Sequence, residues 1–155
     1  MVSPLAMMVL AIRLYDVGQR DDAVFWFYAA RGRYSVLEKV LDTGSLTLAG
    51  VANGMQDFND NAGPVLYGYA FCDFAKEQAA EDKALQWTIA HPYRQLLSPQ
   101  LPALADDRNK AIADAVEALR QQVAAGRAAL AEPARRAQLL EARKRDQADA
   151  KYCWK

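Results

Sequence analysis

The chain of 155 residues has the length of one domain, and its hydrophobic fraction of 52% is enough to form a sizeable core. Lysine plus arginine equals aspartate plus glutamate at 19 each, so the net charge is zero, which argues against general binding to nucleic acid or membrane surfaces. Much of the apolar content is alanine, the strongest helix former, and the chain holds only 8 glycines and 6 prolines. The composition therefore indicates an all-α fold.

The first predicted helix covers residues 3–17. Ser3 supplies an N-cap, Pro4 suits the first helical position, and Leu10 with its neighbours recurs at helical spacing. Gly18 then ends the helix, as a glycine in the left-handed conformation does. Charges interrupt this apolar segment well before the roughly 20 residues needed to span a membrane, so we interpret it as a core helix. A start after a removed leader would look the same.

The second predicted helix runs from the acidic pair Asp21–Asp22 to about Leu41, because acidic side chains suit the positive end of a helix dipole. Residues 25–28 are four consecutive aromatics, and these cover more than one face of the helix. At least one of them should therefore meet another element or a partner. Trp26 is our candidate for a partner contact.

Small and large apolar residues alternate across these two helices and the turn between them. The pattern consists of Leu10, Ala11, Leu14, Gly18, Ala23, Phe27 and Ala30. It resembles the helix-turn-helix unit of tetratricopeptide and Sel1-like repeats, over about 30 residues. In such a unit small residues let two antiparallel helices approach, and an aromatic fills the remaining gap. The resemblance implies a helical bundle built around one hairpin or, alternatively, a short helical-repeat-like array.

Residues 43–63 contain four of the eight glycines and predict a long loop with at most one helical turn. A loop of this length is either functional or hides structure. Asp57, Asn59 and Asn61 match the first three ligand positions of an EF-hand, but the glycine and the distal glutamate of that motif are missing. We therefore expect turns and caps here, with a looser cation site as the alternative.

Prolines and acidic N-cap residues indicate where the later helices begin and end. We expect a helix from Pro64 to about residue 80 and a second helix over 82–90, which His91–Pro92 ends. A connector follows over 92–105. A long amphipathic helix then runs from Asp106–Asp107 to about 130, and a last helix covers 134–150. The apolar residues of the long helix recur close to heptad spacing. Pairing of residues 106–130 with their copy is therefore the predicted route to a homodimer. Pro133 should either kink this helix or begin the last one.

Few residues suggest chemistry. Cys72 and Cys153 are far apart and form no CxxC motif, so we interpret them as two free thiols; a disulfide between them would require an oxidising compartment. His91 is the single histidine, which excludes a multi-histidine metal site, and it sits where a helix-end residue is expected. No nucleophile elbow or P-loop motif is present. We expect no catalytic residue, no cofactor and no metal.

The sequence therefore predicts a single all-α domain, residues 1–155, with an aromatic-rich core half over 1–93 and an Ala/Arg-rich helical half over 105–150. The predicted function is non-enzymatic protein binding, as in a bacterial immunity or adaptor protein that holds one cognate partner such as a toxin or effector. The candidate partner-binding residues are Trp26, Asp57, Asn59, Asp60 and Tyr69.

Two other functions stay open at this point. One is a small enzyme with a site of carboxylates, tyrosines and His91, and the other is a self-associating structural protein. We expect a cytoplasmic protein without a membrane span, or a periplasmic one if an upstream leader has been removed.

Overall fold

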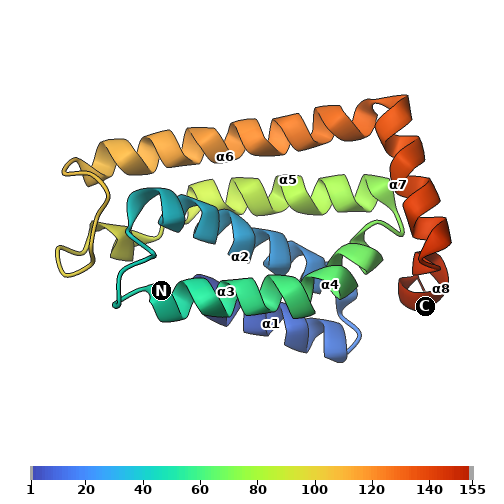
Figure 1. Cartoon of the computed structure of the whole chain (residues 1–155), viewed down its shortest axis with the longest axis horizontal. Helices are drawn as coiled ribbons and strands as arrows, with labels where there is room; N and C mark the ends of the chain where they lie inside the picture. Colours follow the sequence, from blue (N-terminus) through green and yellow to red (C-terminus); the bar gives the residue numbers. More distant parts are fainter. Residues whose placement is uncertain (1, 154–155) are drawn as a thin grey trace.

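The computed structural model describes residues 2–153, and all regular elements in that range are helical, which confirms the predicted all-α class. The elements are α1 (Pro4–Asp16), α2 (Arg20–Val40), α3 (Ala49–Asn61), α4 (Gly63–Ala70), α5 (Phe74–Ala90), the 3-10 turn η1 (Arg94–Leu97), α6 (Arg108–Ala131), α7 (Pro133–Arg145) and α8 (Ala148–Tyr152) (Figure 1). None of these described helices is long and apolar enough to cross a membrane.

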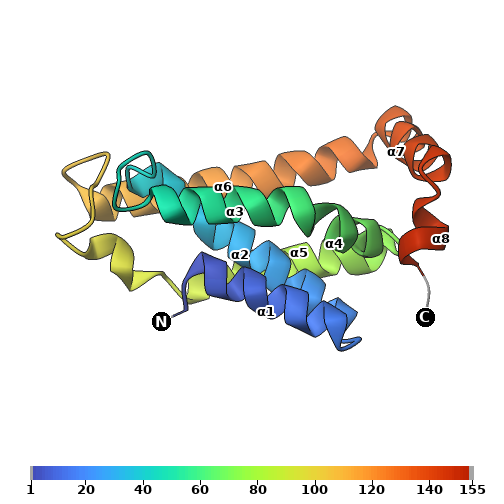
Figure 2. The ribbon, with the colours of Figure 1, turned by 60° about the horizontal axis from the view of Figure 1, so that its bottom comes forward.

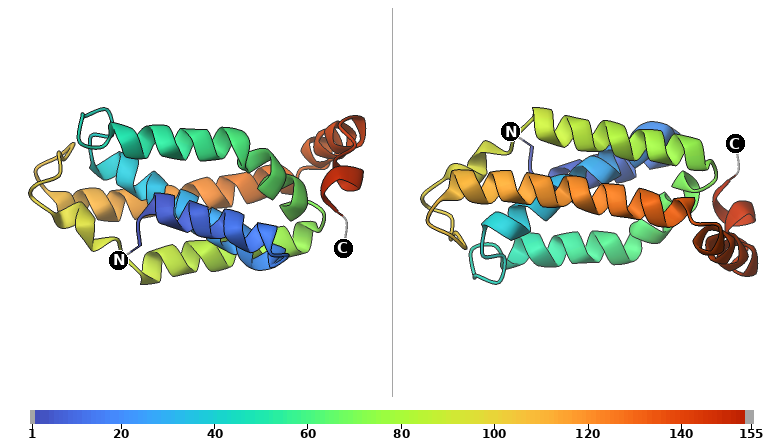
Figure 3. Two further views of the ribbon diagram at one scale, coloured as in Figure 1. Left: turned by 90° about the horizontal axis from the view of Figure 1, so that it is seen from below. Right: turned by 90° about the horizontal axis from the view of Figure 1, so that it is seen from above.

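The helices form an elongated bundle with α2 at its centre. α2 packs against α1, α4, α5 and α6, and α3 lies beside α1 and α4 (Figure 2). The connections from α2 to α3 and from η1 to α6 meet at one end of the bundle, where Asp42 N–H donates to the Pro102 carbonyl at 3.0 Å. α7 and α8 lie across the opposite end (Figure 3).

The hairpin of α1 and α2 forms as its caps and turn predict. The Ser3 hydroxyl accepts a hydrogen bond from Ala6 N–H at 3.2 Å, and Gly18 has a φ of +85°, a conformation that favours glycine. Ala23, Phe27 and Ala30 are fully buried. The resemblance to tetratricopeptide and Sel1-like units stays a prediction.

The apolar face predicted for α1 is partly wrong. Met7, Met8 and Ala11 are fully buried, whereas Leu10 is exposed. The helix is covered by α2 and α3, and this pair of neighbours selects the face that carries the two methionines. The spacing alone is compatible with either side of the stripe, because both faces of this short helix are apolar.

The predicted loop over 43–63 is also wrong, because α3 occupies most of it and α4 begins at Gly63. Glycine was interpreted as a helix breaker, but Gly54 serves helix packing instead. A Cβ placed at Gly54 would lie 2.9 Å from Leu5 Cδ2, so the missing side chain lets α1 approach α3. This close approach depends on tertiary contacts that a local pattern does not reveal.

The break between the next two helices lies at residues 71–73 rather than near residue 81. Asp73 is the N-cap of α5, and its carboxylate accepts from Ala75 N–H at 3.0 Å and Lys76 N–H at 3.1 Å. The capping bonds compensate two of the free amides at the start of a helix, which is why the chain divides here.

The long helix α6 begins as predicted, with Asp107 accepting from Lys110 N–H at 2.9 Å. Its apolar residue Leu119 is buried, and Ile112, Val116 and Val123 pack in the same cluster. Pro133 begins the separate helix α7. Because α2 and α5 cover the apolar face of α6 within the chain, pairing through 106–130 stays a prediction without added support.

Cys72 and Cys153 form a disulfide with a Cα–Cα distance of 5.5 Å, so the interpretation as free thiols is wrong. The two cysteines are separated by 81 residues, and α7 with α8 folds back across the end of the bundle to bring them together. Buried Arg143 supports this closure: its guanidinium donates to the Gly68 carbonyl at 3.1 Å and to Asp149 Oδ1 at 2.6 Å.

Removal of the disulfide should destabilise the fold. A cross-link over this many residues restricts the unfolded chain, so Cys153→Ser should lower the free energy of unfolding by about 2–4 kcal/mol. Urea unfolding under non-reducing conditions measures the effect. With a reducing agent the wild type and the variant should unfold alike, and equal stability of the two without reductant would contradict the pairing.

Phe27 should be the most sensitive position of the hairpin, because its ring is 0% exposed. Phe27→Ala removes this buried volume and should cost about 3–5 kcal/mol of unfolding free energy. Leu46→Ala is the matched control, since Leu46 is 101% exposed in the α2–α3 connection. Denaturant unfolding of both variants checks the prediction, and a loss below about 1 kcal/mol for Phe27→Ala would show that the ring is not packed as described.

Candidate functional site

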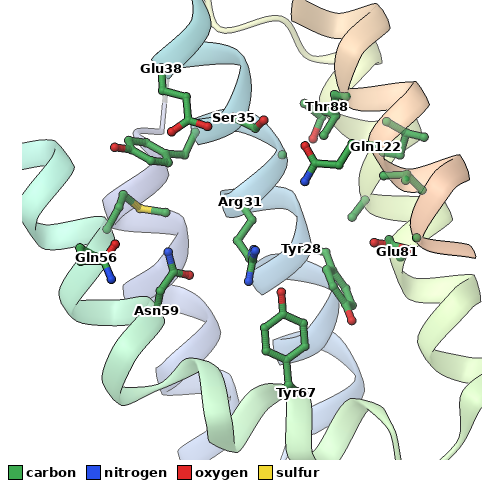
Figure 4. Close-up of a pocket in the computed structure, with 18 of the residues that line it drawn as sticks. Tyr28, Arg31, Ser35, Glu38, Gln56, Asn59, Tyr67, Glu81, Thr88 and Gln122 are labelled. Carbon is green, nitrogen blue, oxygen red and sulfur yellow. The ribbon is translucent and has the colours of Figure 1, made fainter. Parts of the chain in front are cut away.

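A cavity of about 460 Å³ lies between α2, α3, α4, α5 and α6 (Figure 4). Its volume falls in the range typical of small-molecule sites, and such sites commonly form between the helices of a bundle. The cavity is therefore the candidate functional site of this domain.

Four helices, α2, α3, α5 and α6, supply most of the wall with residues at the spacing of one helix face, and α4 adds one residue. The lining residues are Tyr28, Arg31, Gly32, Tyr34, Ser35 and Glu38 from α2; Ala52, Met55, Gln56 and Asn59 from α3; Tyr67 from α4; Glu81, Ala84, Leu85 and Thr88 from α5; and Leu119, Gln122, Val123 and Gly126 from α6. Each inward face mixes polar and small residues. Such a face is unusual inside a bundle, where apolar side chains normally fill the space.

Small residues keep the cavity open. A Cβ added at Gly126 would meet no atom within 4 Å, and a Cβ at Gly32 would lie 3.2 Å from Thr88 Oγ1. Ala52 and Ala84 line the cavity with single methyl groups. Gly126, Ala52 and Ala84 therefore contribute almost no volume to the cavity, whereas Gly32 allows α2 to lie close to Thr88 of α5.

Arg31 lies in the middle of the cavity, with Asn59 and Gln56 on one side and Tyr28 on the other (Figure 4). Its guanidinium carbon lies 5.0 Å from the ring centre of Tyr67 and 5.5 Å from that of Phe27. Over residues 2–153 it has no hydrogen bond or ion pair. A cation held by aromatic faces alone retains unused donor capacity, which favours an anionic ligand.

Glu81 supplies a negative group to the same cavity. Burial and the neighbouring Glu77 raise the pKa of Glu81 to about 7, while Arg127 and Arg31 act in the opposite direction. Burial also raises the pKa of Glu77, whose carboxylate accepts a hydrogen bond from the Tyr28 hydroxyl at 2.6 Å. Glu81 can therefore exchange a proton near neutral pH.

Two further polar atoms in the cavity wall lack partners among the described residues. These are Thr88 Oγ1, on a residue only 6% exposed, and Asn59 Oδ1. A buried polar atom without a hydrogen bond is destabilising, and such atoms in native proteins usually have a functional or solvent partner. Both atoms are shielded from solvent, so a ligand would reach them only after rotation of these side chains.

Of the five residues predicted to bind a partner, only Asn59 lines the cavity. Asp57 and Asp60 lie on the exposed face of α3. Trp26 is partly buried with its ring centre 5.2 Å from that of Trp87, and the Tyr69 hydroxyl donates to Asp21 Oδ1 at 2.8 Å. The structure thus assigns Trp26 and Tyr69 contacts within the chain, and does not bring the five residues together at one site.

His91 does not line the cavity. Its ring stacks on Trp87 with a centroid distance of 4.8 Å, and Nδ1 lies 2.8 Å from the Trp87 carbonyl oxygen. Within residues 2–153, no group of three His, Cys, Asp or Glu side chains is placed to hold a metal ion. The polar groups of the cavity suit an organic or small anionic ligand better than a resident metal.

Sequence reasoning missed Arg31, Gln56, Glu81, Thr88 and Gln122. A signal was present in α2, where Tyr28, Arg31, Ser35 and Glu38 recur at helical spacing beside a strongly apolar face. One amphipathic helix with a polar stripe normally faces solvent, so the stripe alone does not indicate a cavity. The cavity becomes visible only when the polar stripes of several helices face each other.

Glu81→Gln should stabilise the protein at neutral and alkaline pH. The carboxyl titrates near 4.5 when unfolded and at about 7 when folded, so wild-type stability relative to the variant should fall as pH rises from about 4.5 to 7. Above pH 7 the difference should stay constant, on the order of 1 kcal/mol after solvent screening.

Urea unfolding between pH 4 and pH 8 measures this difference. Asp57→Asn on the exposed face of α3 is the matched control. A wild type that gains stability over Glu81→Gln as pH rises would contradict the assignment.

Comparison with known proteins adds one relative. The chain is 35% identical over 153 residues to a protein of Haemophilus influenzae that is described as an uncharacterized protein. The match covers 99% of this chain and 59% of that protein, so the chain spans little more than half of its relative's length. No protein-family model and no solved structure matches the chain.

Proposed function

We propose that this chain is a binding protein that holds a small anionic molecule in the cavity between α2, α3, α5 and α6. The observation that carries the proposal is Arg31, a cation in the middle of the cavity whose donors have no partner among the described residues. The proposal keeps the non-enzymatic function expected from the sequence and moves recognition from a protein surface into a cavity.

The chemistry of Arg31 suits a carboxylate or a phosphate. A guanidinium presents two parallel N–H donors that match a pair of anionic oxygens, and its charge strengthens these hydrogen bonds. The rings of Phe27 and Tyr67 restrict its orientation, so less side-chain freedom is lost when a ligand binds. The amides of Gln56 and Asn59 lie in the opposite wall and can contribute further hydrogen bonds (Figure 4).

We also propose that the protein works in an oxidising compartment, which is the periplasmic alternative. The disulfide between Cys72 and Cys153 supports this, because such bonds persist where the thiol-reducing systems of the cytosol are absent. Three other functions stay predictions from the sequence: binding of a toxin, effector or other protein, catalysis with His91, and self-association.

Thermal unfolding with added anions tests the binding proposal. We expect at least one of acetate, succinate, inorganic phosphate and 4-methylpentanoate to raise the Tm of the wild type, since a ligand that binds only the folded state stabilises it. The shift should vanish in Arg31→Gln and be partly retained in Arg31→Lys, which keeps the charge and loses the paired donors.

Arg135→Gln is the matched control, because Arg135 lies on the exposed face of α7. It should respond like the wild type. Equal shifts in the wild type and in Arg31→Gln, or no shift with any of the four anions, would refute the proposal.

A further inference from the structure

The cavity presents charges of both signs from different helices. Arg31 comes from α2 and Glu81 from α5, and both line the same space. They attract each other, since Arg31 lowers the pKa of Glu81, but among the described residues they form no ion pair within 4.0 Å. Two opposite charges that face one cavity without touching are complementary to a molecule that carries both charges itself.

Neighbouring contacts keep the two groups apart. Arg31 rests on the rings of Phe27 and Tyr67. The charged and titratable groups around Glu81 are Glu77 and Asp82 on α5, Arg127 on α6, Arg31 and Tyr28 on α2, and Tyr67 on α4. Arg127, the cation of α6, is already paired with Asp82. Glu81 is therefore left with no dedicated cation of its own.

The same cavity has an apolar wall. Leu85 from α5 and Leu119 and Val123 from α6 line it, and Leu119 is buried. Apolar lining combined with a few fixed polar groups is the usual composition of a small-molecule site. An aliphatic group placed against this wall would be removed from water while its polar end faces Arg31.

We infer that the ligand is a zwitterion of the amino-acid class, either a free amino acid or a dipeptide with an aliphatic side chain. Its carboxylate binds Arg31, its ammonium group binds Glu81, and its side chain packs against Leu85, Leu119 and Val123. The inference rests on the proposed anion-binding function and adds the second charge and the apolar group.

Proton exchange distinguishes a zwitterion from a simple anion. An ammonium group beside Glu81 favours its ionised form, so binding near pH 7 should release protons. A carboxylate alone brings negative charge closer to Glu81 and should cause proton uptake or no change. The sign of the proton exchange can be measured by calorimetry in two buffers of different ionisation enthalpy.

The test uses matched probes in titration calorimetry on the intact chain. Leucine is compared with 4-methylpentanoate, which lacks the ammonium group, and with 3-methylbutylamine, which lacks the carboxylate. Glycylleucine is compared with N-acetylglycylleucine, because a cavity of about 460 Å³ has room for more than one amino acid. For the tighter of the two zwitterions, removal of either charge should weaken binding at least about tenfold.

Variants at the two charged residues test which of them binds which end of the ligand. Glu81→Gln should abolish the preference for the zwitterion over its carboxylate analogue and should abolish proton release, while Arg31→Gln should abolish binding of both. Asp57→Asn, on the exposed face of α3, is the control and should bind like the wild type. Circular dichroism of each variant confirms that a lost affinity does not reflect a lost fold.

The outcomes separate this inference from the proposed function. If 4-methylpentanoate binds as tightly as leucine and depends on Arg31, anion binding stands and the zwitterion is refuted. Binding of neither zwitterion also refutes the inference, whatever the anion panel shows. Tight binding of 3-methylbutylamine alone would refute both proposals.

Discussion

The burial of α2 is the constraint on which the rest of this structure depends. The helix is covered by α1, α4, α5 and α6, and more than half of its 21 residues are buried. A polar side chain that such a helix places inside the bundle must find a partner there or a cavity that supplies one. The arrangement of both the core and the candidate site follows from how α2 meets this requirement.

Two arginines on α2 differ in whether they find hydrogen-bond partners within the chain. Arg33 is 3% exposed, donates to the Val2 carbonyl at 2.7 Å and to the His91 carbonyl at 2.8 Å, and lies over the Trp87 ring. These bonds tie the N-terminal segment and the end of α5 to α2, which is a structural role. Arg31, two residues earlier, points to another side of the helix and has aromatic faces but, among residues 2–153, no hydrogen-bond acceptor. The core arginine has acceptors within the chain, whereas the arginine of the candidate site has none among the described residues.

The end of the bundle that α7 and α8 cover is also held by close contacts and a paired arginine. α4 and α8 approach so closely that a Cβ at Gly68 would overlap the Tyr152 ring. Arg143 fills its donor capacity at the Gly68 carbonyl and Asp149, and the disulfide fixes the same segment covalently. The cross-link restricts the unfolded chain and thereby adds to the stability that these contacts give to this end of the domain.

Sequence alone determined the helical class, the hairpin with its caps at Ser3 and Gly18, and the start of α6 at Asp107, because these features depend on local backbone chemistry. It also identified Phe27 as a core residue. Only the tertiary structure decided that Gly54 belongs to a helix, that Cys72 meets Cys153, and that residues of five helices line one cavity around Arg31. These features depend on contacts between residues far apart in the chain, which local spacing and propensity do not encode.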